Sequence, residues 1–302
     1  MFELVARNRR RSAVLIALFA LFTAFVLLAV GYGVGLGAWG IAVALIGAAL
    51  LSGGTYWKSD AIALRASRAR PADATEFARL HNLVEGLCIA SGVPKPRLYV
   101  IDDPAPNAFA TGRNPQHGAL AVTTGLLERM NRVELEGVLA HELSHIKNYD
   151  IAVSTLAVMV VGAVTLLTDL SWRFHWMSGH RRRTDGSGPG PGALLALVGL
   201  VLVAVGPIAA RLMHFAVSRR RESLADFSAV EITRYPPGLI SALEKLAADD
   251  TVVRSGSRAT AHLWIEDPMA QDFGTGNWVR LNRWFNTHPP LQERIDALRE
   301  LL

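Results

Sequence analysis

The amino-acid sequence predicts an α+β protein, mostly helical with a small β-sheet, that also carries four transmembrane or membrane-embedded helices. The first observation is composition: 51% of the 302 residues are hydrophobic and 19% are charged, a balance too apolar for an ordinary soluble protein. The second is that apolar residues gather in four long runs, separated by segments that mix short β-type runs with helical periodicity. We therefore expect a polar domain attached to a lipid bilayer.

Composition also excludes some classes of protein. The single cysteine, Cys88, leaves no intrachain disulfide and no cysteine-based metal site. The net charge is +5, but the sequence has no nucleic-acid motif and no basic helix interleaved with aromatic residues, so we expect no nucleic-acid partner. On a membrane protein, this excess of arginine indicates anchoring at the cytoplasmic leaflet.

The first two apolar runs lie at the N-terminus. No charged residue occurs from Ser12 to Trp57, and the stretch reads as two spans, residues 12–31 and 37–54, joined by the glycine-rich turn GYGVGLG. Each is close to the ~20 residues that a bilayer requires. The basic start is compatible with a signal peptide, but the run is long for one and a second run follows at once. We expect an N-terminal transmembrane hairpin within residues 1–54.

A second pair of apolar runs covers residues 151–168 and 193–210. It predicts a second membrane hairpin within residues 151–213. The alternative is a buried or partly inserted hairpin, because the loop between the two runs contains HRRR and fits poorly with a loop carried across a membrane. Whether this pair fully spans the bilayer stays open at this point.

Counting spans places the two polar parts, residues 55–150 and 214–302, on the same side as the N-terminus, so they can form one domain. The basic residues that flank the spans are unevenly distributed between the two sides. The shared side carries Arg7, Arg9, Arg10, Arg11, Lys58, Arg65, Arg68, Arg70, Arg211, Arg219, Arg220 and Arg221, and the opposite side Arg173, Arg181, Arg182 and Arg183. This excess predicts that the polar domain and both termini are cytoplasmic, in a multi-pass protein of the cell inner (plasma) membrane.

The polar domain is expected to contain helices and short strands. Residues 72–91 have helical periodicity, and PRLYVI (96–101) reads as a strand. DDPAPN (102–107) is a turn-rich loop. ALAVTT (119–124) reads as a second short strand, followed by a helix around Leu126.

The next helix carries the motif HELSH. Asn131 and Glu134 fit the N-cap and N3 positions that open it. Because side chains four residues apart lie on one helix face, His141 and His145 can direct their rings at one ion. Glu142, about 100° around the axis, can reach a water in the open coordination position and take its proton, which is the arrangement of HExxH zinc peptidases. The alternative is a helix whose two histidines form hydrogen bonds in a core.

A catalytic zinc needs a third protein ligand. SRRRESLADFSAVEI (218–232) reads as a helix on which Glu222 and Asp226 share a face. Glu222 is the preferred third ligand, and Asp226 can accept a hydrogen bond from a ligand histidine, His141. Taken alone, the segment also fits a charged surface face. Lower-ranked candidates for the third ligand are Glu231, His262 and His288.

At these motifs the sequence resembles the HtpX-type membrane zinc metalloproteases, relatives of the CAAX prenyl proteases. The resemblance rests on NAFATG (107–112), GLL (125–127), HELSHIKNYD (141–150), RRRESLAD (219–226) and NTHPPLQERI (286–295), in the family's order. It implies a zincin-like metalloprotease domain with one Zn²⁺ per chain bound by His141, His145 and Glu222, and with Glu142 as catalytic base. It also implies an endopeptidase of protein quality control that cuts misfolded or damaged membrane proteins on the cytoplasmic face.

The resemblance further suggests that an edge strand near the metal pairs with an extended peptide substrate. The candidate strand is Gly118 to Thr123, with its central residues at the substrate and with Asn107 and Ala108 near the cleft. The substrate-binding candidates are Asn107, Ala108, Leu120, Ala121 and Val122. The alternative is that the segment forms an ordinary hairpin.

His288 is a candidate catalytic residue that would stabilise the oxyanion of the tetrahedral intermediate. It also fits a histidine that merely precedes a helix, because Pro289 and Pro290 follow it. Asn148 and Asp150 are expected to end the metal helix rather than to act in the chemistry.

Two other functions are compatible with the sequence. One is a processing protease that cuts a single defined partner or a prenylated tail. The other is a membrane scaffold or chaperone whose zinc is structural, and the variant Glu142→Gln would separate it from a protease.

Overall fold

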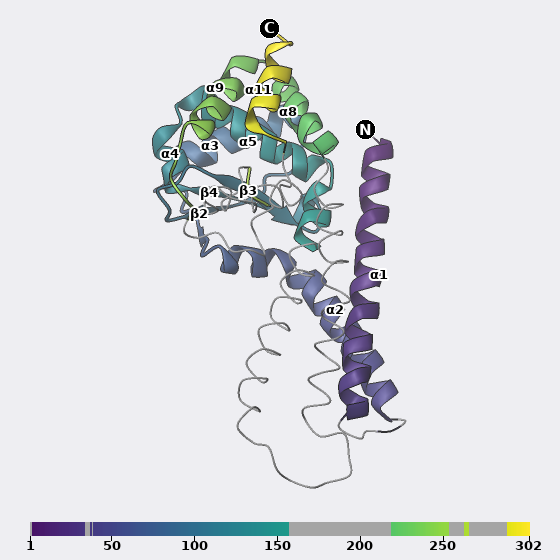
Figure 1. The fold of residues 1–302 in the computed structure, drawn as a ribbon. Coiled ribbons are helices and arrows are strands. Elements are labelled where there is room, and N and C mark those ends of the chain that lie inside the picture. The colour runs from purple at the N-terminus through teal and green to yellow at the C-terminus, as the bar shows by residue number, and fades with distance from the viewer. Residues whose placement is uncertain (1, 34–36, 38, 157–218, 254–262, 266–288) are drawn as a thin grey trace, which may run out of the picture.

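The structure, a computed structural model, describes residues 2–33, 37, 39–156, 219–253, 263–265 and 289–302. It is mostly helical with one small mixed sheet, as the sequence predicts (Figure 1). The helices are α1 (Phe2–Gly33), α2 (Trp39–Ala66), α3 (Ala78–Ser91), α4 (Thr124–Arg129), α5 (Arg132–Lys147), α8 (Arg219–Thr233), α9 (Pro236–Ala247) and α11 (Leu291–Arg299). The strands are β1 (Arg70–Pro71), β2 (Arg97–Ile101), β3 (Ala108–Gly112) and β4 (Gly118–Thr123), with a short 3-10 turn, η1 (Pro115–His117), before β4.

The sheet has the strand order β1-β2-β4-β3. β2 and β4, the two strands predicted from the sequence, pair in parallel, whereas β3 pairs with β4 as an antiparallel hairpin. β1 adds two residues antiparallel to β2. Such a short edge that contains Pro71 offers little for another chain to pair with.

This topology corrects the prediction for the substrate strand. β4 lies inside the sheet between β2 and β3, so its backbone groups are already used on both sides. Its residues Leu120, Ala121 and Val122 are fully buried. The prediction that Gly118–Thr123 is an edge strand is therefore wrong. The edge next to it belongs to β3, a segment for which no element was predicted from the sequence.

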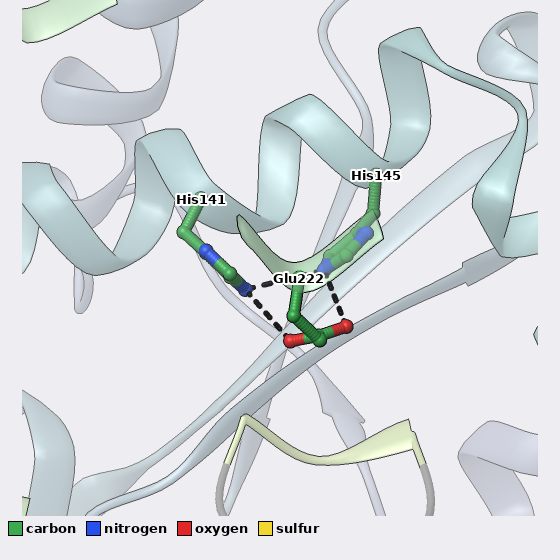
Figure 2. A group of neighbouring side chains, drawn as sticks. All are labelled: His141, His145 and Glu222. Carbon is green, nitrogen blue, oxygen red and sulfur yellow. Dashed lines mark hydrogen bonds and ion pairs between the residues drawn. The ribbon is translucent and has the colours of Figure 1, made fainter. Parts of the chain in front are cut away.

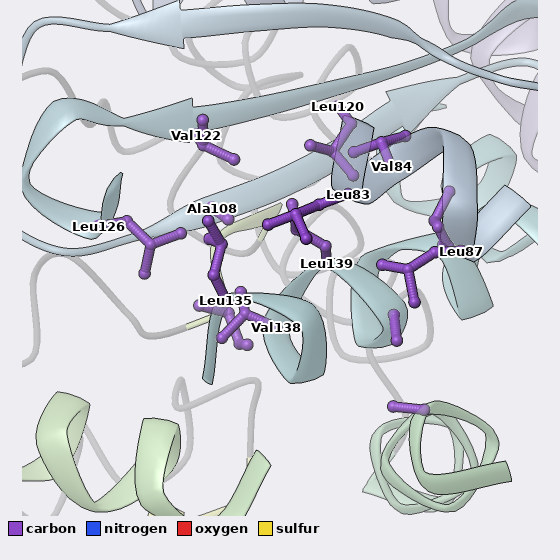
Figure 3. Packing of buried hydrophobic residues seen from close by; sticks show 14 of the residues in the cluster. Leu83, Val84, Leu87, Ala108, Leu120, Val122, Leu126, Leu135, Val138 and Leu139 are labelled. Atoms are coloured by element: carbon purple, nitrogen blue, oxygen red, sulfur yellow. The ribbon is translucent and has the colours of Figure 1, made fainter. Parts of the chain in front are cut away.

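The two faces of the sheet are covered by different helices, as the period of two along each strand requires. Leu98, Val100, Leu120 and Val122 belong to the main core together with leucines and valines of α3 and α5. Figure 3 shows Leu120 and Val122 on the side of these helices. The alternate residues, including Phe109, face the other way and pack against the end of α2. The sheet is thus held between the membrane-type hairpin and the helix that carries HELSH.

Among the described residues, two helices are long and apolar enough to cross a membrane, Ala6–Leu28 within α1 and the whole of α2. They pack side by side, and their ends near Gly33 and Trp39 project away from the rest of the domain (Figure 1). Their outer faces expose large apolar side chains such as Leu21 at 67% and Leu50 at 71%, which suits contact with lipid tails better than contact with water.

α2 is longer than the predicted span of residues 37–54. It continues to Ala66, where Ala63 and Leu64 pack against the sheet. One unbroken helix therefore joins the apolar hairpin to the polar domain. Most of the second apolar pair, residues 151–168 and 193–210, lies outside the described residues, although residues 150–156 are helical.

The helix predicted over residues 72–91 begins later than expected, since α3 starts at Ala78. Asp73 accepts hydrogen bonds from the backbone amides of Thr75 and Glu76, and this local turn competes with a helix. The amide of Ala72 instead bonds to the carbonyl of Leu98 and extends the sheet.

The helix that carries HELSH, α5, begins as the sequence predicts. Asn131 and Glu134 form a capping box, in which each side chain accepts from the other residue's amide. Gly137 then allows α9 to approach closely, because a Cβ at this position would lie 2.8 Å from the Cα of Leu239. α5 is thus buried along most of its length, with α3 and the sheet on one side and α8 and α9 on the other (Figure 1).

Candidate metal centre

The two histidines of HELSH converge as their spacing predicts. His141 and His145 lie one turn apart on α5, and their Nε2 atoms are 3.2 Å from each other (Figure 2). His141 is fully buried and His145 retains slight exposure. The rings are nearly perpendicular, at 86°, so both Nε2 atoms point at one small volume between them.

Glu222 brings a carboxylate into the same volume from a distant part of the chain. Its Oε2 lies 3.6 Å from the Nε2 of His141, and its Oε1 lies 3.6 Å from the Nε2 of His145 (Figure 2). One ligand atom from each of the three residues lies within 4.8 Å of the others. The two histidines and the glutamate, which is 81 and 77 positions further along the chain, therefore form one cluster.

The sequence of α8 explains why Glu222 points inward. Positions 222, 225, 226 and 229 share one helix face, and all four residues are buried. Ala225 and Ala229 have no bulk beyond Cβ, which lets α8 lie close against α5. The face that packs on α5 consequently carries its two carboxylates, those of Glu222 and Asp226, to the histidines.

The ring of His141 is oriented by a carboxylate at Nδ1, the nitrogen on the side away from Glu222 and His145. Its Nδ1 is 2.9 Å from Oδ1 of Asp226, the contact expected from the sequence. Asp226 is in turn held by Arg294 of α11, whose Nη2 and Nε donate to its two oxygens at 2.7 and 2.9 Å. With Nδ1–H bonded to a carboxylate, the lone pair on Nε2 of His141 faces Glu222 and His145.

His145 has the same kind of partner. Its Nδ1 lies 3.2 Å from Oδ2 of Asp150, and Nη1 of Arg221 lies 3.3 Å from the other oxygen of that carboxylate. The sequence predicted Asp150 only as a helix end and indicated no role at this site for Arg294 or Arg221. Asp150 follows His145 by five residues, just past the end of the helix, so helical spacing gave no signal for it.

The electrostatics of the cluster favour a cation. Burial and the Arg294 guanidinium lower the pKa of His141, but the carboxylates of Asp226 and Glu222 outweigh them and raise it to about 9. Burial also lowers the pKa of His145, and Glu222 and Asp150 again raise it overall. Two imidazole lone pairs and a carboxylate at this distance are stable only with positive charge between them, supplied by protons or by a metal ion.

The donor set fits a zinc-type ion. Two imidazole nitrogens and a carboxylate oxygen are the ligands of one class of catalytic zinc sites, which keep a fourth position open. At ligand distances of ~2.0–2.2 Å, the ligand atoms around a tetrahedral ion lie roughly 3.3 Å apart. The 3.2 Å between the two Nε2 atoms matches this spacing, and each Nε2 lies 3.6 Å from one of the two oxygens of Glu222.

Glu142, the predicted base, is buried next to His141 on α5. Burial lowers the pKa of the Arg294 guanidinium, but Asp226, Glu222 and, to a smaller extent, Glu142 raise it overall, so the charge of Glu142 acts on Arg294. His262 and His288 lie outside the described residues. Glu231 is exposed on α8, away from the cluster.

Of the predicted substrate residues, Asn107 and Ala108 are buried at the start of β3. β3 packs against α5, so these two residues lie on the sheet edge beside the metal helix. The other three candidates are the interior residues of β4 described above.

A buried group of two histidines and a glutamate, with a further glutamate beside it on the same helix, fits a metalloprotease. The chain belongs to peptidase family M48, whose sequence profile matches residues 74–302. Together with the two apolar helices, this membership makes the chain a membrane-anchored metalloprotease and confirms the class predicted from its sequence.

Curated relatives match along the whole chain. The protease HtpX homolog of Caldanaerobacter subterraneus subsp. tengcongensis is 43% identical over 307 residues, which cover 100% of this chain and 98% of the relative. The protease HtpX homologs of Dictyoglomus turgidum and Streptococcus gordonii are 40% and 39% identical, with 99% and 100% of this chain covered and 94% and 100% of the relatives.

Among solved structures, the crystal structure of S. mikatae Ste24p is similar, with a TM-score of 0.50 and 18% sequence identity. The match covers 99% of this chain and 67% of Ste24p. At this identity the similarity shows a shared fold.

Proposed function

We propose that this chain is a zinc-dependent endopeptidase that binds one Zn²⁺ through His141, His145 and Glu222. The observation that carries the proposal is the convergence of the three ligand atoms within 4.8 Å, with both histidines oriented by buried carboxylates. The zincin-like assignment of the domain rests on the same geometry.

The residues around the ion have separate roles in the proposed hydrolysis. Zinc, when bound, acts as a Lewis acid and lowers the pKa of a water towards ~7. Glu142 accepts the proton of the attacking water and later delivers it to the leaving amine. Asp226 and Asp150 keep the rings of His141 and His145 in the tautomer that presents Nε2. His288 is proposed to donate a hydrogen bond to the oxyanion.

We propose β3, in place of β4, as the strand that pairs with the substrate. The amide of Thr123 donates to the carbonyl of Asn107, so the alternate residues Ala108 and Ala110 turn their backbone groups away from β4. Ile265 donates to the carbonyl of Ala108 on that side. Within the described residues, the outward amide and carbonyl of Ala110 take no hydrogen bond and can hold an extended peptide without regard to its sequence.

The position of the site suits substrates that emerge from a bilayer. α2 runs from the apolar hairpin directly onto the sheet, and residues 150–156 continue from the metal helix towards the second apolar pair. We propose that residues 1–54 and 151–213 are embedded in the cell inner membrane as four helices, and that residues 55–150 and 214–302 form one cytoplasmic catalytic domain. Misfolded or damaged membrane proteins are the proposed substrates.

The decisive experiment compares wild type with Glu142→Gln, both purified in detergent. We expect one zinc per chain in both proteins and hydrolysis of casein by wild type alone, with the variant slower by roughly 10²–10⁴-fold because it lacks the base. Absence of zinc in an active wild type would contradict the metal assignment. Full activity of Glu142→Gln would contradict the role of Glu142. Cleavage confined to a single peptide of a broad library would favour the processing protease instead.

A further inference from the structure

Asn8 is a polar residue of the first membrane-type helix that is buried at 2% exposure. Its neighbours Arg7 and Arg10 are exposed, as expected of a basic segment at a bilayer surface. A buried amide needs hydrogen-bond partners, and Asn8 finds both of its partners about 140 positions further along the chain.

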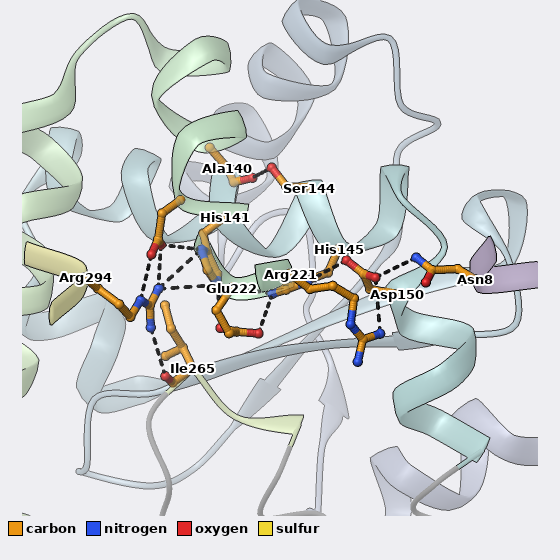
Figure 4. A network of polar contacts seen from close by, with 11 residues as sticks. Asn8, Ala140, His141, Ser144, His145, Asp150, Arg221, Glu222, Ile265 and Arg294 are labelled. Carbon is orange, nitrogen blue, oxygen red and sulfur yellow. Dashed lines mark hydrogen bonds and ion pairs between the residues drawn. The ribbon is translucent and has the colours of Figure 1, made fainter. Parts of the chain in front are cut away.

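The Nδ2 of Asn8 donates to the carbonyl oxygen of Asn148 at 2.8 Å and to Oδ1 of Asp150 at 2.7 Å (Figure 4). These two acceptors flank Tyr149, whose φ of 59° is in the left-handed region, where a bulky side chain is strained. Asn8 therefore joins the two sides of the sharp turn that ends the metal helix. A strained turn of this kind persists only where surrounding contacts hold it.

Asp150 connects this clamp to the metal centre. Its Oδ2 lies 3.2 Å from Nδ1 of His145, while its Oδ1 receives Asn8 and, at 3.3 Å, Nη1 of Arg221. The carboxylate is buried at 3% exposure. Its orientation, and hence that of the His145 ring, thus depends on a side chain from α1 and on one from α8.

The other histidine is supported differently. Asp226 orients His141 and is fixed by two hydrogen bonds from Arg294, and both of these supports belong to the polar domain. Only the His145 branch, within the described residues, reaches a membrane-type helix. The two ligands therefore differ in whether the membrane hairpin takes part in placing them.

We propose that Asn8 is a positioning residue of the metal centre, through which the first membrane helix fixes Asp150 and thereby the ring of His145. This inference rests on the proposed function, since it concerns how tightly the site holds its metal. It predicts that α1 contributes to metal affinity as well as to membrane attachment.

The test measures metal affinity of full-length protein in detergent by competing Co²⁺ or Zn²⁺ against a chelator and recording the Co²⁺ absorption spectrum. We expect Asn8→Ala to weaken affinity by about 3- to 10-fold, less than the 10–100-fold typical of a residue that touches a ligand directly. Asn8→Asp keeps the size of the side chain but places an acceptor against Asp150, so it should weaken affinity more than Asn8→Ala.

The matched control is Ser12→Ala, at a buried position one turn along the same helix. In the part of the chain that the structure covers, the Ser12 hydroxyl has no hydrogen-bond partner, so its removal should leave affinity and spectrum unchanged. Asn8→Ala should add little in an Asp150→Asn background, because both changes break one chain of contacts.

The inference is overturned if Asn8→Ala binds metal like Ser12→Ala, if Asn8→Asp is harmless, or if the effects at Asn8 and Asp150 simply add. A role in helix packing alone would give those results, with lower thermal stability at unchanged affinity. A wild-type protein that binds neither ion would overturn the proposed function as well, whereas a metal-binding wild type with an indifferent Asn8→Ala overturns the inference alone.

Discussion

Two glutamates, Glu134 and Glu222, are almost equally buried at opposite ends of the helix that carries HELSH, yet their charges are balanced in different ways. Glu134 lies at the start of α5 and is 2% exposed, and Glu222 faces the end of α5 and is 4% exposed. Burying a carboxylate is costly unless it is paired. The difference between the two lies in where the compensating charge comes from.

The charge of the Glu134 carboxylate is balanced by residues that the fold itself places around it. It accepts hydrogen bonds from Lys245 Nζ at 2.7 Å, from the hydroxyl of Ser241 at 2.7 Å and from the amide of Asn131 at 2.8 Å. A cation and two neutral donors thus surround one carboxylate. The packing of α9 against α5 therefore brings the compensating charge to this end of the helix.

Glu222 faces two imidazole nitrogens at 3.6 Å. The opposite nitrogen of each ring is already bonded to a carboxylate, that of Asp226 or Asp150. The guanidinium of Arg294, which the structure places beside His141, is itself bonded to the carboxylate of Asp226. A buried carboxylate that has a lysine stabilises the fold, whereas one that shares its space with imidazole lone pairs indicates an ion taken from solution.

The largest effect expected from this comparison is loss of the metal in Glu222→Ala. Removing one of three ligands should lower zinc affinity by more than about 100-fold, the upper end for residues that only support a ligand, and should abolish casein hydrolysis. Zinc content of the purified variant, measured by elemental analysis, checks the expectation. Glu231→Ala is the matched control, because Glu231 is an exposed glutamate on the same helix. Equal losses in the two variants would remove Glu222 from the ligand set.

The convergence of His141, His145 and Glu222 is the feature that the sequence predicted best. HELSH and the helix face of Glu222 and Asp226 each define one side of a helix, and helical spacing alone orients their side chains. The capping box of Asn131 and Glu134 was predicted for the same reason. Local periodicity was sufficient wherever the partners lie within one or two turns.

The parts that were missed depend on contacts between distant segments. No strand was predicted for β3, and its pairing with β4 is what makes it a strand. The edge of the sheet is therefore β3, whereas the sequence predicted β4. Asp150, Arg294 and Asn8 reach the centre through a turn or from other helices, so no spacing rule identifies them. Secondary structure was thus more predictable than the order of the strands and the outer contacts of the site.

The next largest effect should follow from Asp226→Asn. The change keeps the shape of the side chain but removes the charge that orients His141 and pairs with Arg294, and zinc affinity should fall by about 10–100-fold. Chelator competition on the purified protein measures it. Asp296→Asn, at an exposed position of α11, is the control and should bind zinc like wild type. An unchanged affinity in Asp226→Asn would mean that His141 is oriented by its packing alone.

At the other end of α5, Glu134→Ala should affect stability but not the metal. The variant loses the capping box and the bonds to Ser241 and Lys245, which together contribute about 2 kcal/mol. Urea unfolding in detergent should show the loss, with zinc content unchanged. Glu136→Ala removes a surface pair with Arg132 on the same helix and should cost less than about 1 kcal/mol. A Glu134→Ala protein that unfolds like wild type but loses zinc would reverse the roles assigned to the two glutamates.

The smallest effect is the pH dependence that Glu134 confers. Burial raises the pKa of its carboxyl, but hydrogen bonds from Lys245, Asn131 and Ser241 outweigh burial and lower the pKa below its ordinary value of 4.5. A carboxyl with a lowered folded-state pKa stabilises the fold above its unfolded pKa, and this contribution disappears as pH falls through the folded value. The stability difference between wild type and Glu134→Gln, both freed of metal by a chelator, should therefore be constant above about pH 5 and shrink in more acidic solution. Urea unfolding at several pH values measures this difference. A gap that stays constant into acid would mean that Lys245 does not hold the ionised form of Glu134, and the contrast with Glu222 would lose its electrostatic basis.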